Sequence, residues 1–92
     1  MKIIVKPGFE RDVDRIRSHE LRIALAQKIS QIEKAKDTSR ITGLKQLIGY
    51  SSHFRILVKT EKYSYRIGAV VRGDAIWLVR FLPRRIVYKR FP

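Results

Sequence analysis

The stretch HFRILVKTEKYSYRIGAVVRGDAIWLVRFL, residues 53–82, contains three apolar segments separated by short polar breaks at 60–62 and 72–74. Residues 53–59 and 63–71 alternate between apolar and other side chains, which is the period of a β-strand with one buried face. Residues 75–82 are apolar at nearly every position, which indicates a central strand covered on both faces. Loops this short join antiparallel neighbours, so this stretch predicts a three-stranded meander.

The residues before this stretch predict one strand and two helices. Residues 1–6 are rich in β-branched side chains and end at a Pro-Gly turn. A first helix is indicated by Phe9, Val13 and Ile16, which would form its buried stripe, with charged residues between them. Ser18 can cap a second helix that ends near residues 36–37. The apolar face of this second helix is predicted to comprise Leu21, Ala24, Leu25, Ile29 and Ile32.

Residues 39–52, SRITGLKQLIGYSS, have no clean period and are predicted to be a loop. Leu44 and Leu47 would tuck from this loop against the core. The predicted fold is therefore α+β: an N-terminal strand, a two-helix hairpin, and then a curled antiparallel sheet of three to four strands. At 92 residues the chain is predicted to be one domain, 1–92.

Composition limits the chemistry of the protein. There is no cysteine, and the two histidines, His19 and His53, have no metal-ligand spacing, so we expect neither a metal nor another cofactor. The N-terminal apolar run is too short for a signal peptide, and no segment has the apolar length of a membrane span. We therefore expect a soluble cytoplasmic protein without a membrane partner.

The charge indicates a polyanionic partner. The chain has 21 Lys and Arg residues against 8 Asp and Glu residues, a formal net charge of +13. Residues 53–92 hold 10 of these cations and 2 of the acids, so the excess is greatest there. Such an excess opposes compaction and is typical of proteins that bind polyanions such as nucleic acid.

The predicted strands and the tail after them carry the candidate site. Cations stand on all three strands, at Arg55, Lys59, Arg66 and Arg80, and in the tail at Arg84, Arg85, Lys89 and Arg90. Each could be a solvated charge, and Arg66 and Arg80 could pair with acids. Tyr88 could be packed, stack on a base or transfer a proton, and His53 could be a general base or an exposed turn residue.

Two stretches, GLKQLIGYSSHFRILVKTEKYSYRIGAVV (43–71) and IWLVRFLPRRIVYKRF (76–91), carry a family resemblance. Their leucine-rich connection, the aromatic-Arg pair 54–55, the Tyr-Arg pair 65–66, and an Arg and a Tyr four residues apart at 84 and 88 occur in this order after two helices. The whole chain resembles the RelE/ParE superfamily of bacterial toxins from type II toxin-antitoxin systems.

The RelE branch implies a ribosome-dependent endoribonuclease that cuts messenger RNA without a metal. A ribose 2′-hydroxyl would attack the adjacent phosphate. The resemblance assigns Arg66 and Arg84 to phosphate stabilisation and Tyr88 to base stacking or proton transfer. His53 is the candidate general base. The predicted RNA-binding residues are Arg55, Lys59, Arg80, Arg85, Lys89 and Arg90.

The chain departs from the RelE pattern at Leu57, where a second basic residue is common, and at Leu82-Pro83, where many relatives have Gly-His. Two alternatives therefore stay open: a ParE-like inhibitor of DNA gyrase without nuclease activity, and a basic RNA-binding module that is not an enzyme. The resemblance also implies an acidic antitoxin encoded by an adjacent gene, which would cover the cationic face. The ribosome and messenger RNA would be the other partners.

Overall fold

The computed structural model describes residues 1–92 and has the α+β fold that the sequence predicts. Its elements are β1 (Lys2–Val5), α1 (Pro7–Asp14), α2 (His19–Lys34), the short 3-10 helix η1 (Thr38–Arg40), β2 (Leu44–Gln46), β3 (His53–Lys59), β4 (Ser64–Arg72), β5 (Ala75–Pro83) and α3 (Arg84–Arg90). None of the helices has the length and apolar character that crossing a membrane requires.

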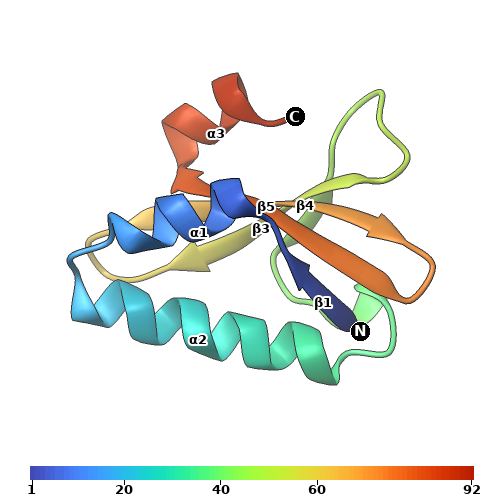
Figure 1. Ribbon diagram of the computed structural model, residues 1–92, viewed down its shortest axis with the longest axis horizontal. Helices are drawn as coiled ribbons and strands as arrows, with labels where there is room; N and C mark the ends of the chain where they lie inside the picture. The colour runs from blue at the N-terminus through green and yellow to red at the C-terminus, as the bar shows by residue number, and fades with distance from the viewer.

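All strands belong to one curled sheet (Figure 1), and their order in it is β1-β5-β4-β3-β2. Strands β3, β4 and β5 form the predicted antiparallel meander. The N-terminal strand β1 pairs with β5 in parallel, so β5 lies between two neighbours, as its apolar sequence predicts. The sheet has five strands because β2, which the sequence analysis did not predict, extends the other edge.

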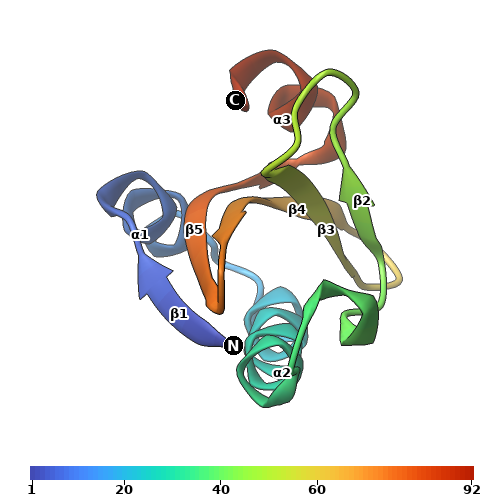
Figure 2. The ribbon, with the colours of Figure 1, turned by 90° about the vertical axis from the view of Figure 1, so that its right-hand side faces the viewer.

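Helix α2 covers one face of the sheet and α1 lies along the edge of β5, and both helices contribute to the main core (Figure 2). The Ser18 hydroxyl accepts a hydrogen bond from the Leu21 N–H at 3.1 Å, which confirms the predicted start of α2. The predicted stripes of both helices also face this core. Among the residues buried there are Phe9, Ile16, Leu21, Leu25 and Ile32 of the helical segment, and Ile56, Val58, Ile67, Ala69, Ile76, Leu78 and Phe81 of the strands.

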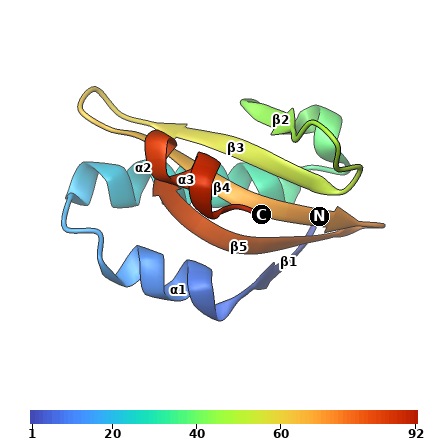
Figure 3. The same cartoon turned by 90° about the horizontal axis from the view of Figure 1, so that it is seen from above.

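Helix α3 lies on the opposite face of the sheet, over β4 and β5 (Figure 3). Its residues Val87 and Phe91 are buried in a second, smaller core with Leu47 and Val70, against which Trp77, Val79 and Leu82 also pack. Gly68 makes this packing possible, because a Cβ there would lie 2.6 Å from Cγ of Phe91. The predicted fold ended with the sheet, so this helix is an element that the prediction did not contain.

Two further expectations were wrong. Residues 44–46 form strand β2 instead of a loop, although Leu47 is buried as expected. Asp12 was expected among the charged surface residues of the first helix, but it is 4% exposed. Its carboxylate forms an ion pair with Arg80 of β5, which supplies the partner that a buried carboxylate needs.

Candidate functional site

Helix α3 fixes the relative positions of Arg84 and Tyr88. These residues are four apart on the helix and therefore lie on the same face, one turn from each other. Pro83 precedes the helix with φ of −55°, a value that its ring imposes, and Leu82 packs against the smaller core. The Leu82-Pro83 departure from the RelE pattern thus anchors the start of the helix that carries the two candidate residues.

Strands β2, β3 and β4 bring further cations to the same face. Arg66 of β4 is paired in register with Leu57 of β3, and two residues away Arg55 pairs with Gly68. On the next strand Lys45 is opposite Arg55. Because side chains that are directly opposite in an antiparallel pair point to the same face, these cations project toward α3.

These elements surround one hollow with a volume of about 340 Å³. It is lined by Gly43, Leu44, Lys45, Arg55, Leu57, Arg66, Arg84 and Tyr88. Four of these side chains are cations, and no carboxylate lines the hollow. The structure therefore brings together Arg66, Arg84 and Tyr88, the three residues predicted as catalytic, with Arg55 of the predicted RNA-binding set.

The ring of Tyr88 lies against two guanidinium groups. The Arg55 Cζ is 4.2 Å from the centroid of the ring, and the Arg84 Cζ is 5.9 Å from it. Both distances are within the range of a cation–π interaction. Tyr88 is nevertheless 49% exposed, so it is not a core residue, and part of its ring remains accessible to a ligand.

The cations also change the acidity of Tyr88. Its pKa is lowered from the ordinary tyrosine value, mainly by a hydrogen bond from the Arg84 side chain and further by the charges of Arg84, Arg66 and Arg55. The reason is that nearby positive charges and hydrogen-bond donors favour the phenolate. The Tyr88 hydroxyl is thus a stronger acid than an ordinary phenol, and it faces a cationic hollow.

None of the arginines in this hollow is paired with an acid. Arg66 donates to the Ser64 hydroxyl at 3.0 Å and to the Tyr65 carbonyl at 3.3 Å. The Nε atom of Arg55 is buried and has no hydrogen-bond partner within the protein. The guanidinium groups of Arg55 and Arg66 therefore suit an anionic ligand, because their hydrogen bonds to a phosphate or carboxylate are stronger than those to a neutral acceptor.

Arg80 has a different environment from the other arginines. Its guanidinium donates to both carboxylate oxygens of Asp12, at 2.7 and 3.1 Å, at the edge of β5 beside α1. The structure thus shows Arg80 paired with an acid, which is one of the alternatives that the sequence left open. Arg80 does not line the hollow.

The remaining predicted residues lie around or beyond the hollow. Lys59 is at the far end of β3 and lines a separate depression against α2. His53 begins β3, and its ring centroid is 5.0 Å from that of Tyr50 and 5.7 Å from that of Phe91. Arg85, Lys89 and Arg90 are exposed on α3.

Lys45 is the lining cation that sequence reasoning missed. It was assigned to a loop without a period, so no face was predicted for it. The sequence signal was Gly49, because a glycine between two apolar runs indicates a hairpin. In the structure Gly49 has φ of +84° in the connection between β2 and β3.

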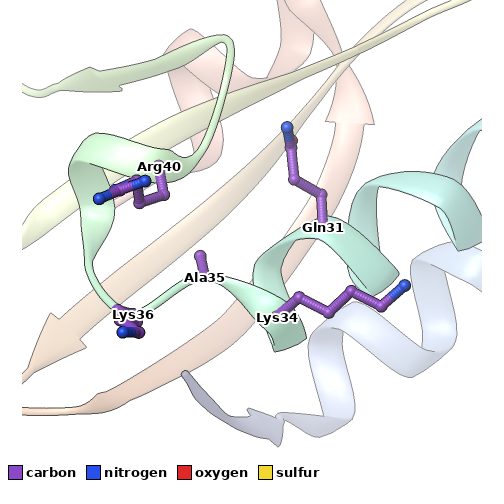
Figure 4. A pocket seen from close by; sticks show the side chains of 5 residues that line it. All are labelled: Gln31, Lys34, Ala35, Lys36 and Arg40. Atoms are coloured by element: carbon purple, nitrogen blue, oxygen red, sulfur yellow. The ribbon is translucent and has the colours of Figure 1, made fainter.

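Another hollow, of about 350 Å³, lies beside the C-terminal end of α2 and η1. It is lined by Gln31, Lys34, Ala35, Lys36 and Arg40, and it has neither an aromatic side chain nor a buried polar group. Figure 4 shows that the Lys34 side chain extends away from Gln31 and Arg40. Its cations do not converge as those around Tyr88 do. No group of three or more His, Asp or Glu side chains in the protein is arranged to bind a metal ion.

Comparisons with known proteins identify relatives of this chain. A scan against protein-family models finds no match. The chain is 32% identical over 97 aligned positions to Toxin RelE3 of Methanocaldococcus jannaschii, and the alignment covers 100% of both chains.

The fold is similar to one chain in the crystal structure of a RelB-RelE antitoxin-toxin complex from Methanococcus jannaschii. The two share 26% identity with a TM-score of 0.73, over 97% of this chain and 99% of the other. A relative of this similarity over its full length establishes the family: the chain belongs to the RelE family of toxins.

Proposed function

We propose that this RelE-family protein inhibits translation by cutting messenger RNA on the ribosome. The observation that carries the proposal is the position of Tyr88, half-exposed between Arg55 and Arg84 in a hollow that four cations and no carboxylate line. A phosphodiester needs cations for its charge, and a leaving alkoxide needs an acid. Both are present on one face of the sheet.

In the proposed reaction the 2′-oxygen of one ribose attacks the adjacent phosphorus as its proton is removed. The bond from phosphorus to the 5′-oxygen of the next nucleotide breaks, leaving a 2′,3′-cyclic phosphate and a free 5′-hydroxyl. Arg66 and Arg84 stabilise the negative charge on the phosphate oxygens. Tyr88 donates its proton to the leaving 5′-oxygen, a role favoured by its lowered pKa.

Arg55 and Lys45 hold the RNA in place in this proposal. The Arg55 guanidinium lies over the Tyr88 ring and is not paired with an acid, so it can pair with a phosphate of the RNA. The accessible part of the Tyr88 ring offers a surface on which a base can stack. The exposed cations Arg85, Lys89 and Arg90 on α3 extend the positive surface along the RNA backbone.

The base that accepts the 2′-hydroxyl proton is assigned to His53 as a hypothesis. His53 and Arg55 are two residues apart on β3 and therefore lie on the same face of the sheet. Neither an imidazole nor a carboxylate lines the hollow itself, so the base would have to reach the RNA from beside it. A His53→Gln variant that keeps the full cleavage rate would remove His53 from the mechanism.

An acidic antitoxin is the proposed protein partner. The related crystal structure is of an antitoxin-toxin complex, and the present chain has a net charge of +13. An acidic segment that covers the face around α3 would neutralise the cations and block RNA entry. The gene for this partner is expected beside the toxin gene.

The test is to add the purified protein to a translation reaction and to naked messenger RNA, and to map the RNA ends. Cleavage with a 5′-hydroxyl product only when ribosomes are present supports the proposal. Intact RNA together with inhibited supercoiling by DNA gyrase would instead support a ParE-like function. RNA binding without either effect would leave a non-catalytic binding module.

A further inference from the structure

Strand β5 contains an irregularity that determines which of its side chains face α3. The register with β4 shifts between Gly68 and Ala69: Gly68 pairs with Arg80, whereas Ala69 pairs with Leu78, so Val79 is an extra residue. An extra residue of this kind is a β-bulge. Its effect is seen in the core, where Ile76, Leu78 and Phe81 are buried on one face with a spacing of two and then three residues.

The bulge is necessary for the geometry of the site. Without the extra residue, strict alternation would continue from Ile76 and Leu78 and would turn Leu82 toward the main core and Phe81 toward α3. With it, Leu82 packs against the smaller core under α3 and stands opposite Arg66. Arg84 follows two residues later, so the phase of the strand determines the direction in which α3 begins.

Helix α1 holds this bulge from the edge of β5, beyond the residues that β1 pairs with. Asp12 accepts hydrogen bonds from the Arg80 side chain and from the backbone N–H of Phe81, the latter at 2.9 Å. One turn earlier, Gly8 lies so close that a Cβ there would be 3.0 Å from the Val79 carbonyl oxygen. The pair is well protected, because the side chains of Asp12 and Arg80 are 3% and 27% exposed.

We propose that Asp12 is a positioning residue for the candidate active site. By holding Arg80 and the Phe81 N–H at the edge of β5, it keeps the bulge in place and thereby orients Arg84 and Tyr88 on the face of the sheet where α3 lies. Asp12 itself does not line the hollow, and its carboxylate accepts hydrogen bonds from Arg80 and Phe81, which do not line it either. The effect on cleavage rests on the proposed function, whereas the effect on the position of Arg84 does not.

The two effects are separated by measuring the ionisation of Tyr88 by NMR with carbon-13-labelled tyrosine, alongside ribosome-dependent cleavage. In Asp12→Asn, Arg84 should lie farther from the Tyr88 hydroxyl, so the Tyr88 pKa should rise toward the ordinary value. The turnover number should fall about 10²-fold, the size of effect expected for a displacement of about 1 Å, with a smaller change in KM. Asp14→Asn is the matched control, since Asp14 is an exposed acid on the same helix.

A double variant, Asp12→Leu with Arg80→Met, separates positioning from stability. Apolar replacement of a buried ion pair often preserves or raises stability, so this variant should fold even if Asp12→Asn does not. If Asp12 is a positioning residue, the double variant should have a wild-type thermal midpoint but still a raised Tyr88 pKa and a lowered turnover number. If the Tyr88 pKa and the turnover number return to wild-type values together with the thermal midpoint, Asp12 and Arg80 contribute only to stability. A Tyr88 pKa that rises in a protein whose wild type cleaves no RNA would support positioning and overturn the proposed function.

Discussion

At the scale of single residues, the proposed chemistry centres on Tyr88. Its ring contacts Arg55 and its hydroxyl is acidified by Arg84, so one side chain joins a stacking surface to a proton donor. The structure brings these residues together, but the role of each one remains a proposal. Substitutions that remove one property at a time can separate them.

Tyr88→Phe removes the hydroxyl and keeps the ring. The proposal predicts that the cleavage rate falls about 10²- to 10⁴-fold, the usual contribution of a general acid, while RNA affinity changes little. The thermal midpoint should stay unchanged, because Tyr88 is 49% exposed. Tyr50→Phe is the control, since Tyr50 is 45% exposed and lies outside the hollow. An unchanged rate in Tyr88→Phe would show that only the ring matters.

The pH dependence of cleavage should report the Tyr88 ionisation. A proton donor must be protonated, so the rate should fall as pH rises through the Tyr88 pKa, and this fall should occur below the pH at which an ordinary tyrosine ionises. Arg84→Gln removes the main cause of the lowered pKa. It should therefore reduce the rate and also move the alkaline fall to higher pH. A rate that instead rises through this range would identify Tyr88 as a base.

At the scale of elements, α3 is the part on which the site depends, and it is held by few contacts. Only Val87 and Phe91 anchor it in the smaller core, and Phe91 rests directly on Gly68. The glycine is needed here for space and not for its backbone conformation. The same contact keeps the C-terminal end of the helix against the sheet.

Gly68→Ala should therefore displace α3. A Cβ at this position would be 2.6 Å from Cγ of a ring that is only 3% exposed, so the ring has little room to move. Overpacking of this kind costs about 1–3 kcal/mol, measurable as a lower urea midpoint, and the cleavage rate should fall with it. In a Phe91→Ala background the same substitution should cost much less. Equal costs in both backgrounds would show that the Phe91 contact does not explain the effect.

At the scale of the whole molecule, a large excess of positive charge is combined with one hollow that four cations and no carboxylate line. The net charge of +13 attracts any polyanion. The hollow in addition offers four cations at fixed positions, Lys45, Arg55, Arg66 and Arg84. Binding of RNA should therefore depend both on overall charge and on these particular positions.

Salt dependence can distinguish these two contributions. For a single-stranded RNA oligomer, the logarithm of the affinity should fall linearly with the logarithm of the salt concentration, and Lys45→Gln should reduce the slope by about 0.7 if Lys45 contacts a phosphate. Lys36→Gln, an exposed cation beyond the end of α2, is the matched control and should leave the slope almost unchanged. Fluorescence anisotropy over a salt series measures both. Equal slopes for the two variants would indicate diffuse attraction only.

The sequence by itself determined the α+β class, the meander and the cap of α2, because these follow from local period and hydrogen bonding. It also pointed to Arg55, Arg66, Arg84 and Tyr88, through a family resemblance that the comparisons support.

Three features were decided only by the tertiary structure. Tail residues 84–90 form a helix because Val87 and Phe91 find a second core, beside a glycine that the chain places 23 residues before Phe91. Lys45 enters the site because β2 pairs with β3. Arg80 does not line the hollow because its guanidinium donates to the carboxylate of Asp12, 68 residues earlier in the chain. The local pattern of a sequence does not encode such long-range partners, since each depends on where the sheet brings distant segments together.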